Sequence, residues 1–118
     1  MKKPKSNDLP PVLEEFAAKY PDLWNAYNAL GEAATKAGPL DEKTQKLVKL
    51  AIAIGAQREG AVHSHAKRAL KAGATPEELI HVGIQGITTI GWSGAFAGIC
   101  WMNETISRSR RPKMTRKK

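Results

Sequence analysis

A short run of residues, from Gly73 to Glu78, ends one helix and begins the next. Gly73 follows the last turn of a helix, where glycine adopts the left-handed conformation without the steric penalty of a Cβ atom. Thr75 is a favourable N-cap residue, Pro76 suits the first helical position, and Glu78 stands three residues after Thr75, which completes a capping box. The chain is therefore expected to contain two consecutive helices joined by a tight turn.

The rest of the sequence also has the pattern of helices. Apolar residues recur at the helical period, and no segment has the pattern of a strand. The connections are short, so neighbouring helices are expected to pack antiparallel or at steep angles. The sequence predicts one all-α domain of about six helices, over Pro11 to Lys19, Asp22 to Lys36, Asp41 to Ala56, Glu59 to Ala72, Pro76 to Ile90 and Trp92 to Ser107.

Several of these helices are apolar on nearly every side. Between Leu47 and Ala56 the only charged residue is Lys49, and a helix of this kind is normally buried. The chain has 118 residues, of which 42% are hydrophobic, enough for one core with little surplus. One chain of this size cannot bury all of its apolar helices, so we expect an obligate homo-oligomer.

The formal net charge of +8 belongs mainly to the two ends of the chain. Residues 105–118 hold seven Lys or Arg and no acid, whereas residues 10–104 are nearly neutral. We expect a flexible basic N-terminus over residues 1–9, a helical domain over residues 10–107 and a basic disordered tail over residues 108–118. The tail has no aromatic residue to stack on bases, so we favour a solubilising role over nucleic-acid binding, which only this tail would support.

The cysteine content and the apolar stretches indicate a cytoplasmic protein. Cys100 is the single cysteine, so no intramolecular disulfide forms, and we expect its side chain to be buried. The first 19 residues lack the continuous apolar stretch of a secretion signal. Residues 82–103 carry no charge and are long enough to cross a bilayer of about 30 Å. Their polar side chains and five glycines favour two packed helices instead, so no membrane partner is expected.

The helix before Gly73 carries polar side chains on one face. Arg58, Ala61 and His65 stand at i, i+3 and i+7, so at the helical period they point the same way and could line a pocket. His65 is the best catalytic candidate because imidazole titrates near neutral pH, and Arg58 could bind a carboxylate with two hydrogen bonds. The plainer alternatives are a structural, hydrogen-bonded His65 and an Arg58 that pairs with an acid of a neighbouring subunit.

The segment from Leu47 to Glu104 resembles the carboxymuconolactone decarboxylase family, which includes the alkyl hydroperoxidase D-like proteins. The resemblance implies an all-helical fold and assembly into trimers or hexamers. It is most specific in Ile54-Gly55-Ala56-Gln57-Arg58-Glu59-Gly60, in His65, and in Ala69 to Glu78.

The peroxidase branch of this family uses a Cys-x-x-Cys pair followed by a histidine, with a glutamate one helix earlier as proton relay. On this sequence the cysteine positions fall on Arg58 and Ala61, the histidine on His65 and the glutamate on Lys46. A thiolate is the nucleophile of that chemistry, so the missing pair argues against a thiol-dependent hydroperoxide reductase. Such an activity would have to rely on Cys100.

The decarboxylase branch fits better, because the run from Gly55 to Gly60 resembles its members. A glutamate that this branch has just after the run is Ala61 here, and a histidine of its last helix falls on Cys100. The chain is therefore either a cofactor-free decarboxylase that moves a proton on a small carboxylated, lactone-like substrate, or a catalytically silent oligomeric binding or scaffold protein. The first hypothesis assigns catalysis to His65 and substrate binding to Arg58, Lys46 and Trp92. The alternatives are a solvated Lys46 and a Trp92 that fills the core or an interface.

The histidine spacing does not predict a metal site. His63 and His65 point about 200° apart on a helix and so cannot bind the same ion. We assign no role to His63 or to His81. The expected partners are a small-molecule substrate and further copies of the chain, with no metal or other cofactor.

Overall fold

The structure, a computed structural model, describes residues 10–110. Over these residues it has six helices of nine or more residues, one helix of four residues and no strand, which confirms the all-α fold class. The chain divides between Pro39 and Leu40 into two compact units. The expected N-terminal segment and residues 111–118 of the expected tail lie outside the described residues, so the proposed domain limits stay a prediction.

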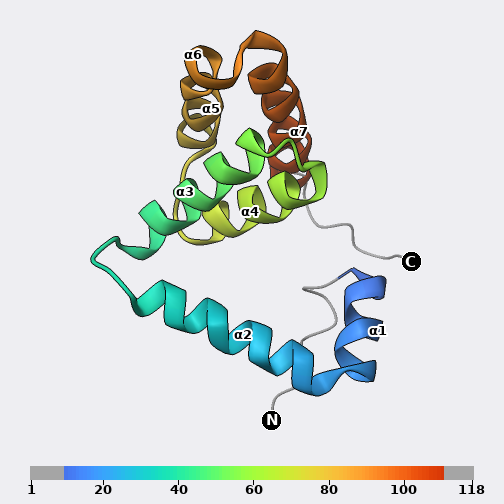
Figure 1. The fold of residues 1–118 in the computed structure, drawn as a ribbon. Helices are drawn as coiled ribbons and strands as arrows, with labels where there is room; N and C mark the ends of the chain where they lie inside the picture. The colour runs from blue at the N-terminus through green and yellow to red at the C-terminus, as the bar shows by residue number, and fades with distance from the viewer. Residues whose placement is uncertain (1–9, 111–118) are drawn as a thin grey trace. The chain divides into compact units, whose positions relative to one another are not determined.

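The first unit consists of α1 (Pro11–Lys19) and α2 (Pro21–Lys36), which are joined at Tyr20 (Figure 1). Each helix has proline at its start, where the missing N–H would have no helical partner. Phe16 of α1 contacts Trp24 of α2, with ring centroids 6.5 Å apart. Among the described residues α2 has no buried side chain, and its large apolar residues remain exposed: Leu23, Tyr27 and Leu30.

The second unit holds the hydrophobic core. Its helices are α3 (Glu42–Gly55), α4 (Glu59–Lys71), α5 (Pro76–Gln85), α6 (Ile87–Ile90) and α7 (Trp92–Arg110). α3 packs along α4, and α7 packs against α4, α5 and α6 (Figure 1). The four longer helices therefore share one core, to which each contributes one of the largest fully buried side chains: Leu50, Val62, Leu79 and Met102.

The boundary between α4 and α5 has the structure that the sequence predicts. Gly73 has a φ of +101°, in the left-handed region. The Thr75 hydroxyl accepts a hydrogen bond from the Glu78 N–H at 3.1 Å, and Glu78 Oε1 accepts one from the Thr75 N–H at 2.9 Å. Lys43 of α3 donates to Glu78 Oε2 at 3.0 Å. The complete capping box therefore also ties the start of α5 to α3.

The single helix expected over residues 76–90 is two helices in the structure, α5 and α6. At the junction the Gly86 N–H donates to the Gly83 carbonyl at 3.0 Å, a bond of the 3₁₀ type that tightens the helix. A Cβ atom at position 86 would lie 3.2 Å from that carbonyl oxygen. Glycine therefore suits this tight turn, which the helical periodicity of the sequence does not reveal.

The uncharged stretch over residues 82–103 is divided among α5, α6 and α7. Gly91, with a φ of +94°, separates α6 from α7. Within the part of the chain that the structure describes, no helix is long and apolar enough to cross a membrane. The glycine pattern therefore marks turns and close packing, as expected.

Candidate functional site

The candidate site centres on His65 of α4, whose ring is partly buried. Its Nδ1 atom is buried and has no hydrogen-bond partner among residues 10–110. Burial lowers the pKa of His65 below its ordinary value of 6.5, and the positive charges of Arg68, Lys49 and Lys46 lower that pKa further. The imidazole is therefore mostly neutral at pH 7 and able to accept a proton.

The three cations around His65 come from two helices. Lys46 and Lys49 stand three residues apart on α3, and Arg68 stands three residues after His65 on α4. The two lysines are partly buried, whereas Arg68 is exposed. Positive charges that gather around a neutral, partly buried imidazole attract an anion, because less water screens them there than on an open surface. The arrangement can thus hold a carboxylate beside a proton acceptor.

The structure brings together two of the four predicted site residues, His65 and Lys46, since the Lys46 charge acts on the imidazole. Arg58 precedes α4 with an extended backbone, φ −105° and ψ 98°, so the helical spacing that placed it beside His65 does not apply. Trp92 begins α7, is exposed and stacks on Phe96 with ring centroids 5.2 Å apart. The binding roles of Arg58 and Trp92 therefore stay predictions.

Two of the charged residues that surround His65 were missed in the sequence, Lys49 and Arg68. Each stands three residues from a predicted site residue, Lys49 after Lys46 and Arg68 after His65, and so belongs to the same helical face. In the sequence Lys49 stands out as the single charge of an apolar helix and as part of a lysine stripe with Lys43 and Lys46, and no site role was assigned to it. The spacing was thus a usable signal for a basic cluster.

The single cysteine lies on α7. The Cys100 side chain is exposed, so the expectation of a buried cysteine is wrong. The sequence contains no second cysteine with which it could form an intramolecular pair. The disulfide cycle of a Cys-x-x-Cys site is therefore not available within one chain.

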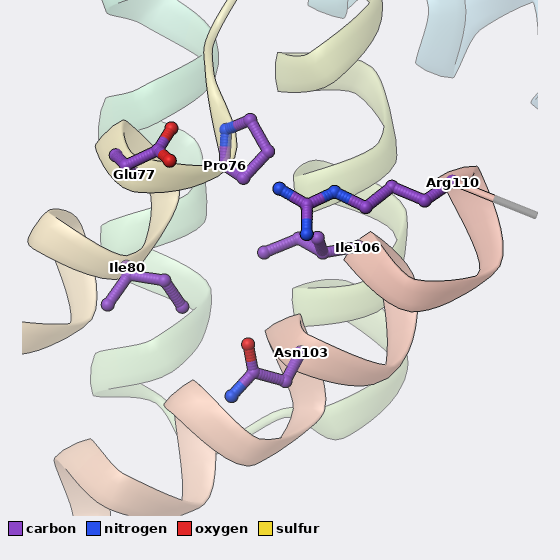
Figure 2. A pocket seen from close by; sticks show the side chains of 6 residues that line it. All are labelled: Pro76, Glu77, Ile80, Asn103, Ile106 and Arg110. Atoms are coloured by element: carbon purple, nitrogen blue, oxygen red, sulfur yellow. The ribbon is translucent and has the colours of Figure 1, made fainter.

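A cavity of about 310 Å³ lies between the start of α5 and the end of α7 (Figure 2). None of the four predicted site residues lines it. Its walls combine isoleucines with one acidic and one basic side chain and contain no histidine. The cavity is therefore separate from the His65 cluster, and its lining residues are Pro76, Glu77, Ile80, Asn103, Ile106 and Arg110.

The helical core defines an all-α class of protein, and its helix α4 carries a partly buried histidine. The sequence model of the carboxymuconolactone decarboxylase family matches residues 21–104, which is most of the chain. The protein therefore belongs to the carboxymuconolactone decarboxylase family.

One solved structure agrees with this assignment, and one further protein is similar over part of the chain. The crystal structure of a carboxymuconolactone decarboxylase family protein from Legionella pneumophila, in its apo form, is similar with a TM-score of 0.74 and 28% sequence identity. The similarity covers 84% of this chain and 88% of that one. An uncharacterised protein from Haemophilus influenzae is 42% identical over 55 residues, which are 47% of this chain. The match spans about half the length of that relative, 49%.

Proposed function

We propose that this protein is a decarboxylase that acts without a cofactor on a small carboxylated, lactone-like substrate, with His65 as the proton-transfer group. The observation that carries this proposal is the buried, unpartnered Nδ1 atom of His65 among three cations. A buried polar atom without a partner is costly unless a ligand or water satisfies it. Family membership supports the reaction class.

The charges around His65 suit both the binding of a carboxylate and the proton transfer that follows loss of carbon dioxide. A substrate carboxylate held by Lys46 and Lys49 offsets their positive charge, which favours protonation of the neighbouring imidazole. When the bond from the substrate carbon to its carboxylate breaks, carbon dioxide leaves and the electron pair stays on that carbon. The imidazolium then donates its proton to the carbanion, so one proton is consumed for each carbon dioxide released.

The test is carbon dioxide release and loss of absorbance with a carboxymuconolactone as the substrate. We expect turnover by the wild-type protein and a loss of about 10²- to 10⁴-fold in His65→Ala. His81→Ala is the matched control, because His81 is an exposed histidine on α5 that contacts Gln85 within its own helix. Equal turnover in His65→Ala and wild-type protein would contradict the proposal.

A second candidate function, a catalytically silent oligomeric binding or scaffold protein, is favoured by the exposed apolar surface. α2 has no buried residue among those described, and Leu23, Tyr27 and Leu30 are 60%, 65% and 69% exposed. The first unit does not cover these side chains by itself, so we propose a homo-oligomer, a trimer or hexamer, under either function. Sedimentation velocity measures the assembly, and an assembled protein with no turnover on any carboxylated lactone favours the second function.

A thiol-dependent hydroperoxide reductase remains the third candidate. The exposed Cys100 is the one thiol that this activity would use. We expect no hydroperoxide reduction, because a lone thiol lacks the partner that completes a disulfide cycle. Hydroperoxide reduction that disappears in Cys100→Ser but persists in His65→Ala would reverse this order of candidates.

A further inference from the structure

Three side chains with metal-binding atoms meet where α4 packs against α7. Glu59 and His63 stand one turn apart on α4, and Glu104 projects from α7. The His63 Nε2 atom lies 3.5 Å from Glu59 Oε2 and 3.5 Å from Glu104 Oε1. One binding atom from each of the three residues falls within 4.8 Å of the others. The packing of two helices therefore brings together two carboxylates and one imidazole.

The imidazole ring of His63 is held in place from its other side. Its Nδ1 atom lies 2.8 Å from the hydroxyl oxygen of Thr105, a buried residue of α7. When Nδ1 carries the ring proton and donates it to this hydroxyl, the Nε2 atom is left with a free lone pair that faces the two carboxylates. Histidine ligands of metal ions are typically fixed in this way, by a hydrogen bond from the nitrogen that does not bind the metal.

The separations of the two carboxylates from His63 Nε2 match a bound ion better than direct hydrogen bonds. Nitrogen and oxygen ligands lie about 2.1 Å from Zn²⁺, which places two ligands of a tetrahedral site about 3.4 Å apart. The two separations of 3.5 Å agree with this value. A hydrogen bond from a protonated imidazole to a carboxylate is shorter, about 2.7–2.9 Å. Both carboxylates thus lie at the distance at which a cation fits between them and Nε2.

We propose that Glu59, His63 and Glu104 bind one divalent transition-metal ion. Zn²⁺ is the ion used to test this site. Two carboxylates neutralise the charge of the ion, and the imidazole nitrogen favours zinc over Mg²⁺, which prefers oxygen ligands. Three protein ligands leave a fourth tetrahedral position for water or another small ligand. The ion would link α4 to α7. The site is independent of the function proposed for His65, because the two histidines point about 200° apart on α4.

The experiment is a calorimetric titration of the full-length protein with Zn²⁺, after removal of bound metal with a chelator. Thermal unfolding with and without Zn²⁺ is the second readout. We expect one Zn²⁺ per chain, a rise in Tm, and no binding of Mg²⁺ at the same concentration. Glu104→Gln and Glu59→Gln should each weaken Zn²⁺ binding by roughly tenfold or more, and His63→Ala should abolish it.

The matched controls are Glu77→Gln, His81→Ala and Cys100→Ser, which alter a carboxylate, an imidazole and a thiol outside the cluster. They should bind Zn²⁺ like the wild-type protein. The two glutamate variants keep the test decisive even if His63→Ala fails to fold, because both carboxylates are more than half exposed. Absence of Zn²⁺ binding, or binding that persists unchanged in Glu59→Gln and Glu104→Gln, would overturn the proposal in favour of a direct contact between His63 and the two carboxylates.

Discussion

Gly98 of α7 lies so close to Ile54 of α3 that no side chain fits between them. A Cβ atom at position 98 would stand 2.8 Å from Ile54 Cγ2 and 3.0 Å from Ile54 Cγ1. Ile54 is itself buried, with 2% of its surface exposed. This contact lets the two helices approach closely, so a side chain at position 98 would alter how α3 packs against α7.

We therefore expect Gly98→Ala to lower the free energy of unfolding by about 1–3 kcal/mol. Ile54 cannot easily move aside, because a β-branched side chain in a helix has one strongly preferred χ1 rotamer. Urea unfolding followed by circular dichroism measures the effect. The control is Gly60→Ala in α4, where a Cβ atom would meet nothing within 4 Å, so the higher helix propensity of alanine should leave stability unchanged or raise it by up to about 1 kcal/mol. Equal effects of the two substitutions would contradict the close contact.

The lowered pKa of His65 predicts that mild acid destabilises the protein. Below pH 6.5 the unfolded chain binds a proton at this histidine more readily than the folded chain does, so unfolding takes up protons. The stability contribution is complete above pH 6.5 and decreases as the pH falls from 6.5 toward the folded pKa. Urea unfolding at a series of pH values should show this loss in the wild-type protein and a smaller loss in His65→Gln.

The control for this pH dependence is His81→Gln. His81 is exposed on α5, and His81→Gln tests whether the change in pH dependence is specific to position 65. If His65→Gln unfolded with the same pH dependence as the wild type, the folded-state pKa of His65 would not be lowered. The partly buried imidazole flanked by cations, from which the proposed reaction is argued, would then lose its support.

Lys46 should control the protonation of His65 through its charge. Its positive charge contributes to the lowered pKa of His65, so Lys46→Glu should raise that pKa and Lys46→Gln should raise it by less. Titration of the imidazole protons by NMR measures all three proteins. Identical His65 titrations in wild type, Lys46→Gln and Lys46→Glu would show that the lysine lies too far away to act on the site.

The sequence predicts well those features of the fold that depend on local chemistry. The end of α4 at Gly73 and the capping box at Thr75 need only residues within one turn of each other, so their pattern is readable directly. The break at Gly86 was not predicted, because glycine tolerates both a helix and a tight turn. Which of the two occurs depends on the packing of α6 against α7, which the sequence does not state.

The site was predicted less well than the fold, for a geometric reason. His65 and Lys46 lie on different helices, and only the family resemblance associated them before the structure showed that the Lys46 charge lowers the pKa of His65. Arg58 was placed by extending the helical period one residue before the predicted helix, but the backbone of Arg58 is extended. The cluster of His63 with Glu104 joins residues from α4 and α7, and no periodicity within one helix can indicate it.

The capping box at the start of α5 gives a last prediction, in which stability depends on both a hydroxyl and pH. Thr75→Ala removes the acceptor of the Glu78 N–H and should cost about 1 kcal/mol, whereas Thr75→Ser keeps the acceptor and should cost less.

The hydrogen bond from the Thr75 N–H, together with the one from Lys43, also holds the pKa of Glu78 below its ordinary value of 4.5. This contribution is complete above pH 4.5 and is lost as the pH falls through the folded pKa. Urea unfolding of Glu78→Gln and wild-type protein should therefore differ most near neutral pH and converge in acid, and a constant difference at every pH would show that the carboxylate charge does not stabilise this helix start.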